Sequence, residues 1–169
     1  MTVCFRQVRC SDSYALRQKA DQVRSIVDKE LGFPESIRKP DHELLRRTYL
    51  YIVDKRVVGM ILAEPIKTAF VLVSNLDRSR HQSRKVLVGI RQMWVHPRFR
   101  GRGLACHLVD AVRNHFLFGC VIAPQQIAFS SPTEAGASFA RKYIEQNAKY
   151  DCNSENHHSP EILMYDCQH

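Results

Sequence analysis

The residues best suited to chemistry are the glycines and arginines of the segment from Arg98 to Ala105, which reads Arg-Phe-Arg-Gly-Arg-Gly-Leu-Ala. Gly101 and Gly103 allow a tight turn before a helix, and the first N–H groups of a helix have no acceptor within it. Such N–H groups bind anions readily. The side chains of Arg98, Arg100 and Arg102 add positive charge and can grip phosphates through paired hydrogen bonds. The segment therefore predicts a pyrophosphate site.

Two other phosphate loops do not fit this segment. The Walker pattern ends in Gly-Lys-Ser/Thr, which is absent here, and the dinucleotide fingerprint needs a third glycine that does not follow Gly103. A glycine turn that serves only packing stays open as the alternative.

The elements that must position this segment are a strand at 87–95 and a helix whose apolar residues run from Leu104 to Phe116. Before them we expect a helix that begins near Ser11 or Ser13 and ends at Gly32. Strands at 48–53, 57–63 and 68–73 suggest an antiparallel meander, interrupted by a basic loop at 75–86. A loop at 33–43, a strand at 127–129, a helix at 133–146, a mobile loop at 151–160 and a last strand at 161–165 complete the expected order.

Composition limits the class of protein. At 169 residues the chain can form one domain, residues 1–169, and it lacks the run of roughly 20 apolar residues that a membrane helix needs. Six cysteines without close pairs favour reduced thiols and hence the cytosol or nucleus. The net charge of +8 suits a phosphate-rich ligand, an acidic protein surface or nucleic acid, and its sign does not choose among them.

The stretch Arg100-Gly-Arg-Gly103-Leu-Ala105 resembles the Arg/Gln-x-x-Gly-x-Gly/Ala loop of the GNAT acetyltransferases, and Trp94-Val-His-Pro97 resembles the strand end before it. The resemblance implies acetyl-CoA as co-substrate. It also implies the α/β (α+β) GNAT fold, a mixed, mostly antiparallel sheet of about six to seven strands flanked by helices.

A narrower resemblance is to the cohesin acetyltransferases, the establishment-of-cohesion enzymes that modify lysines on a cohesin ATPase head. Its most specific segment is Ile127-Ala-Phe-Ser-Ser-Pro-Thr133, and further matches lie at 57–64, 93–95 and 114–119. It implies a protein lysine substrate on that head, a nuclear protein and a role in sister chromatid cohesion. The basic residues 78–85 are a candidate contact to chromatin or DNA.

Carried over by position, the resemblance also implies roles for individual residues. Met93, Trp94 and Val95 should face the pantetheine arm, and Asp110 takes the place of a family glutamate that assists deprotonation of lysine. The residues expected to cradle the pyrophosphate are Arg100, Gly101, Arg102, Gly103, Leu104, Ala105 and Cys106. Those expected beside the cofactor are Thr133, Glu134 and Ala135.

Two departures bear on catalysis. Ser131 replaces a family aspartate, and Arg91 replaces a family serine. For the reaction itself, the resemblance to the GNAT enzymes implies that the amide N–H near Val95 stabilises the oxyanion. We expect Asp110 or a water to act as base and Tyr143 to protonate the thiolate. A helix-surface acid for Asp110 and a core tyrosine for Tyr143 are the competing interpretations.

No metal is expected. Cys4 and Cys10 are too far apart for a zinc knuckle, so the family's preceding zinc finger has no counterpart in this sequence. The irregular set Cys152, His157, His158 and Cys167 is a weak zinc candidate. Two alternative functions remain: a GNAT enzyme acting on a small amine, a protein N-terminus or another protein, and a degenerate GNAT fold used as a binding module.

Overall fold

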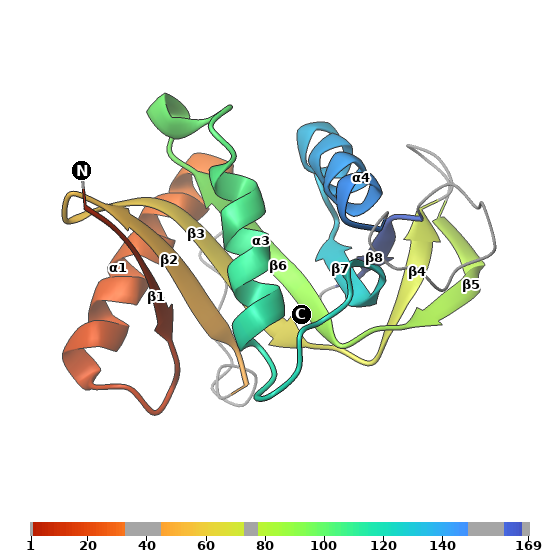
Figure 1. The fold of residues 1–169 in the computed structure, drawn as a ribbon, viewed down its shortest axis with the longest axis horizontal. Coiled ribbons are helices and arrows are strands. Elements are labelled where there is room, and N and C mark those ends of the chain that lie inside the picture. The colour runs from red at the N-terminus through yellow and green to blue at the C-terminus, as the bar shows by residue number, and fades with distance from the viewer. Residues whose placement is uncertain (1, 33–44, 73–77, 149–160, 167–169) are drawn as a thin grey trace. The chain divides into compact units, whose positions relative to one another are not determined.

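The computed structural model describes residues 2–32, 45–72, 78–148 and 161–166. The chain divides into two compact units, which Figure 1 shows as ribbons. The first comprises residues 1–64 and 92–112, and the second comprises residues 65–91 and 113–169. Two elements are divided between the units: strand β6 (Val88–Val95) and helix α3 (Leu104–His115) each have one end in the first unit and the other end in the second.

In the first unit the strands adjoin in the order β1-β2-β3-β6. Strand β1 (Val3–Val8) pairs antiparallel with β2 (Arg47–Val53), and β2 pairs antiparallel with β3 (Arg56–Pro65). Asp54 and Lys55 have φ of 46° and 66°, as a tight hairpin turn between two strands requires. A tight turn therefore joins β2 directly to β3.

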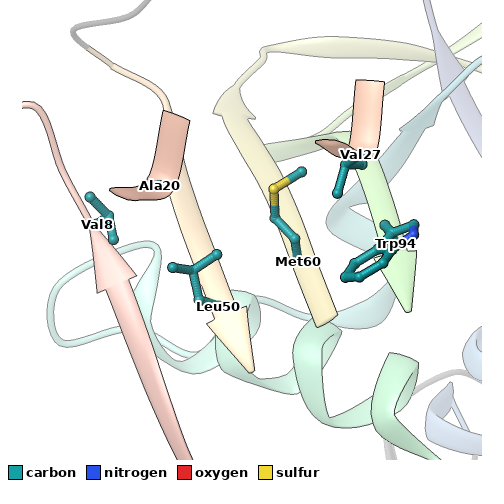
Figure 2. Close-up of a cluster of buried hydrophobic side chains, with 6 residues drawn as sticks. All are labelled: Val8, Ala20, Val27, Leu50, Met60 and Trp94. Atoms are coloured by element: carbon teal, nitrogen blue, oxygen red, sulfur yellow. The ribbon is translucent and has the colours of Figure 1, made fainter. Parts of the chain in front are cut away.

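Helix α1 (Tyr14–Leu31) covers one face of these strands. Ser13 is its N-cap, and Gly32 closes it in the left-handed conformation with φ of 71°, as the sequence predicts. Figure 2 shows the core beneath it, where Ala20 and Val27 of the helix meet side chains from all four strands. The strand residues of this cluster are Val8, Leu50, Met60 and Trp94.

Helix α3 packs on the opposite face of the same strands. A Cβ built on Gly59 would lie 2.9 Å from Cδ1 of Leu108, so glycine lets this helix approach β3 closely. His107 stacks on Tyr51 with ring centroids 6.1 Å apart. In the view of Figure 1, α1 lies behind the strands and α3 in front of them.

In the second unit the order is β6-β7-β8-β4-β5. Strand β7 (Ile127–Ser130) pairs parallel with β6 and with β8 (Leu163–Tyr165), whereas β4 (Thr68–Leu72) pairs antiparallel with β8 and with β5 (Arg78–Lys85). Helix α4 (Glu134–Ala148) follows β7. The core cluster of this unit contains Ala69, Val71, Val86, Ala128, Leu163 and Tyr165.

The expected fold class is confirmed, since a mixed and mostly antiparallel set of strands is flanked by helices. The described residues form eight strands rather than six or seven. Two expectations are wrong. Strand β4 does not extend a meander, because its partners are β5 and β8, and the expected basic loop forms β5 over Arg78–Lys85, paired with β4.

Several expectations lie outside the described residues: the loops at 33–43 and 151–160, and the zinc candidates Cys152, His157, His158 and Cys167. Within the described ranges, no helix is long and apolar enough to cross a membrane.

Candidate functional site

The end of β6 divides its side chains between two faces. Gln92 and Trp94 point to α1, where Gln92 Nε2 donates to Asp28 Oδ1 over 2.6 Å and Trp94 Nε1 donates to Glu30 Oε2 over 2.7 Å. Because side chains alternate along a strand, Met93 and Val95 belong to the other face. The side chain of Trp94 is therefore turned towards α1, and the contact of Trp94 with a pantetheine arm stays a prediction for its backbone.

The turn after β6 is fixed by a series of short bonds. His96 N–H donates to the Val58 carbonyl over 2.9 Å, which extends the strand by one residue. The 3-10 helix η1 (Pro97–Phe99) follows, with Arg98 N–H donating to His96 Nδ1 over 3.2 Å and Phe99 N–H donating to the His96 carbonyl over 2.8 Å. The turn is thus held to the strand at its first residue.

Aromatic contacts continue along the same turn. His96 lies edge to face with Trp94 and with Phe99, at centroid distances of 5.9 Å in both pairs. The guanidinium carbon of Arg102 lies 5.4 Å from the centroid of the Phe99 ring. A cation over an aromatic face is attracted by the ring electrons, so this contact restrains the Arg102 side chain.

Two glycines lead from the turn into α3. Gly101 and Gly103 have φ of 73° and 77°, values that favour glycine, and a Cβ on either would meet no atom within 4 Å. The His107 N–H bond to the Gly103 carbonyl, 3.2 Å long, is the first of the helix, so the N–H groups of Leu104 to Cys106 precede it. Open space beside the two glycines, with no acidic residue in the first turn of α3, suits an anion at this helix N-terminus.

Cys106 and Asp110 lie one turn apart on α3 and are both partly exposed, whereas Leu108, Val109 and Val112 are buried. Burial raises the pKa of the Cys106 thiol, and the negative charge of Asp110 raises it further. The cysteine expected in the phosphate cradle is therefore held in its neutral form, which does not repel a phosphate.

The second unit carries the remaining candidates. Ser131 is exposed and has φ of 31°, which places a non-glycine residue in the left-handed region between β7 and α4. Thr133 caps α4, because its Oγ1 accepts from the Gly136 N–H over 3.2 Å and its carbonyl accepts from the Ala137 N–H over 2.8 Å. Glu134 and Ala135 are exposed in the first turn of this helix.

Tyr143 is only 2% exposed, and its ring stacks on Phe139 at 5.9 Å. Arg113 Nη1 donates to the Tyr143 hydroxyl over 3.2 Å and to Asn147 Oδ1 over 3.4 Å, while Arg113 Nε donates to the Ile122 carbonyl over 2.8 Å. These contacts belong to the packing of the second unit, and the role of Tyr143 as an acid stays a prediction.

The first unit contains the candidates from Met93 to Cys106 and also Asp110. The second unit contains the candidates from Ser131 to Ala135 and also Tyr143. Sequence reasoning missed the carboxylates of Asp28 and Glu30, which lie on α1 and accept hydrogen bonds from the strand that leads to the site. The alternation of 92–95 could have revealed that Trp94 faces a helix. No sequence signal showed which acids of that helix would meet it.

Known proteins resemble this chain in sequence and in structure. A family model described as "ESCO1/2 acetyl-transferase" matches residues 84–152. The mouse N-acetyltransferase ESCO2 is 40% identical over 154 residues, which cover 85% of this chain, and the human ESCO2 is 36% identical over 159 residues. A solved structure of the xEco2 acetyltransferase domain, bound to a CoA conjugate, is 33% identical with a TM-score of 0.79, and the match covers 98% of this chain and 93% of that one.

This chain belongs to the ESCO1/2 acetyltransferase family. The resemblance to the cohesin acetyltransferases is thereby confirmed. The chain spans about a quarter of the length of these curated relatives, 24% of mouse ESCO2 and 25% of human ESCO2. An aminoglycoside acetyltransferase from an uncultured soil sample, 11% identical with a TM-score of 0.52, shares the fold alone.

Proposed function

We propose that this member of the ESCO1/2 family transfers the acetyl group of acetyl-CoA to a protein lysine. The observation that carries the proposal is the turn at Gly101 and Gly103, which opens the N-terminus of α3 to an anion beside three arginines. The CoA conjugate bound by the xEco2 domain supports the same co-substrate.

Acetyl-CoA supplies the activated thioester, and the described residues suit its parts. The pyrophosphate is assigned to the N–H groups and side chains of Arg100 to Cys106. The pantetheine arm is assigned to Met93, Val95 and the backbone of Trp94. Thr133, Glu134 and Ala135 are assigned to the neighbourhood of the cofactor, with the Thr133 hydroxyl engaged in capping α4.

For the transfer step, we assign the Val95 N–H as donor to the developing oxyanion. Asp110 takes a proton from the lysine ammonium, directly or through one water, so that a neutral amine attacks. Tyr143 is the candidate donor of a proton to the departing thiolate. Ser131 stands in the place of a family aspartate, and its hydroxyl can orient the amine but cannot ionise as a carboxylate does.

The substrate we propose is a lysine on a cohesin ATPase-head subunit, acetylated in the nucleus during the establishment of sister chromatid cohesion. We further propose that residues 1–169 act as one catalytic domain and that the basic strand β5 contacts chromatin or DNA. Salt-dependent retention on DNA, reduced when Arg84 and Lys85 are neutralised, would support the last point.

A second candidate function follows from Arg91 and Ser131. Both replace polar or acidic side chains that the resemblance places at the site, and a guanidinium repels a lysine ammonium. This favours an acceptor that is neutral more often than the cohesin lysine, such as a small amine of low pKa or a protein N-terminus, whose α-amino group has an ordinary pKa of about 8.

The test is calorimetric titration with acetyl-CoA, followed by mass spectrometry of a cohesin head subunit incubated with protein and acetyl-CoA. Binding of acetyl-CoA together with an acetylated lysine on the cohesin head subunit supports the proposal. Binding with transfer only to other amines supports the second candidate, and no binding would leave a degenerate module.

A further inference from the structure

One peptide unit at the end of β6 is held at both of its polar groups. The Val95 carbonyl accepts a hydrogen bond of 3.0 Å from Arg100 Nε, and the His96 N–H of the same peptide donates to the Val58 carbonyl over 2.9 Å. Because a peptide is planar, fixing its oxygen and its nitrogen fixes its orientation. This peptide directly follows the Val95 N–H that the proposed function assigns to the oxyanion.

We propose that Arg100 is a positioning residue, which acts through its Nε–H bond to Val95 and not only through its positive charge. The inference rests on the proposed function, since it concerns the group that stabilises the oxyanion. An oxyanion donor is effective only if it is oriented before the reaction begins. The Arg100 bond restrains the ψ angle of Val95 and so the strand end on which the donor lies.

The neighbouring arginines do not share this role. Arg102 lies over the Phe99 ring, and Arg98 bonds His96 through its backbone N–H. A guanidinium has five N–H donors in a planar fork, so Arg100 can bond Val95 through Nε and still offer its terminal nitrogens to a phosphate. Bound phosphate and strand end would then be joined through a single side chain.

Charge and positioning can be separated by substitution. In glutamine, Nε2 is attached to Cδ as Nε is in arginine, so Arg100→Gln keeps an N–H donor for Val95 without the charge. Arg100→Ala removes both. Arg98→Ala removes a charge from the same turn and leaves the bond to Val95 in place.

The kinetic experiment compares two acetyl donors, acetyl-CoA and acetyl-pantetheine, which has the thioester but no pyrophosphate. We expect Arg100→Ala to lower kcat with acetyl-CoA by roughly tenfold, and kcat/KM with acetyl-pantetheine by a similar factor. Arg100→Gln should keep most of the rate with acetyl-pantetheine. Arg98→Ala should raise KM for acetyl-CoA. Its loss of kcat/KM with acetyl-pantetheine should be smaller than that of Arg100→Ala. The proposal would be overturned if Arg100→Ala kept the wild-type kcat/KM with acetyl-pantetheine. It would also be overturned if Arg100→Ala and Arg100→Gln lost kcat/KM with this donor to the same extent.

A second measurement on the free protein does not depend on acetyl transfer. Hydrogen exchange of the His96 amide should be about tenfold faster in Arg100→Ala than in the wild type and near the wild-type rate in Arg100→Gln, while the Ile61 amide of β3 is unchanged. Unchanged His96 exchange in Arg100→Ala would contradict the positioning role. If the exchange changes as expected but the wild type transfers no acetyl group, the proposed function fails and the restraint of the strand end stands.

Discussion

The indole Nε1 of Trp94 donates a 2.7 Å hydrogen bond to Glu30 Oε2, which ties the strand before the candidate site to the last turn of α1. Trp94 is the only tryptophan of the chain and is 6% exposed. Two residues earlier, Gln92 bonds Asp28 in the same way. The helix and the strand are therefore joined by two polar contacts at the edge of an apolar core.

Glu30→Ala should lower the free energy of unfolding by about 1–3 kcal/mol, because it leaves the buried indole N–H without its carboxylate acceptor. Urea unfolding followed by the fluorescence of Trp94 measures this directly. Glu30→Gln keeps an acceptor oxygen and is the matched control, expected to lose less. Equal losses in the two variants would show that the bond contributes little.

Gly103→Glu should weaken acetyl-CoA binding by about a hundredfold or more, since it places bulk and negative charge where the pyrophosphate is assigned and strains a backbone with φ of 77°. Gly119→Glu is the matched control. Gly119 also has a positive φ, 71°, with no atom within 4 Å of a built Cβ, and it has no assigned role in the cofactor site. Calorimetry that finds both variants binding equally well would overturn the loop assignment.

The sequence predicted the helices and the strand-turn-helix motif well because local signals determine them. Ser13 and Gly32 bound α1, and the glycines before Leu104 mark the start of α3. Strand partners were harder to predict. The partners of β4 are β5, next in sequence, and β8, more than ninety residues away along the chain, and no local pattern specifies such a distant pairing.

Side-chain partners could not be predicted for the same reason. Periodicity shows that Trp94 and Gln92 share a face, but which acids of α1 meet them depends on how the helix packs across the strands. For the basic strand β5, the sequence led to a wrong prediction of secondary structure. Its charged composition suggested a loop, whereas it lies at the end of the strand order and pairs with β4, and an edge strand accommodates charged side chains.

Asp110→Asn should leave acetyl-CoA affinity unchanged and slow transfer by about a hundredfold, because the amide cannot accept the lysine proton. The substitution changes few atoms, so folding should be preserved. Titration with acetyl-CoA and a steady-state assay on the same preparation separate the two effects. A turnover equal to the wild type would assign the base to another group or to water.

Alkylation of Cys106 by iodoacetamide should be slow and should accelerate only at a higher pH than an ordinary thiol requires, because burial and then Asp110 raise its pKa. A raised pKa means that the folded protein favours the neutral thiol over the thiolate. The stability that the neutral thiol contributes is therefore present below the pKa of an unfolded cysteine and is lost as pH rises through the raised pKa of Cys106. Asp110→Asn should speed the reaction at a fixed alkaline pH. Mass spectrometry of the Cys106 peptide, with exposed Cys4 as internal reference, measures this, and an unaffected rate would remove Asp110 as a cause.

Tyr143→Phe keeps the ring that stacks on Phe139 and removes only the hydroxyl that accepts from Arg113. If Tyr143 protonates the thiolate, kcat should fall by about a hundredfold at constant acetyl-CoA affinity, with about 1 kcal/mol less stability. Asn147→Ala removes another acceptor of the same guanidinium and should cost similar stability while sparing kcat. If Tyr143→Phe and Asn147→Ala lower the temperature of thermal unfolding and kcat by equal amounts, Tyr143 serves only the packing of the second unit. The thiolate must then take its proton from water.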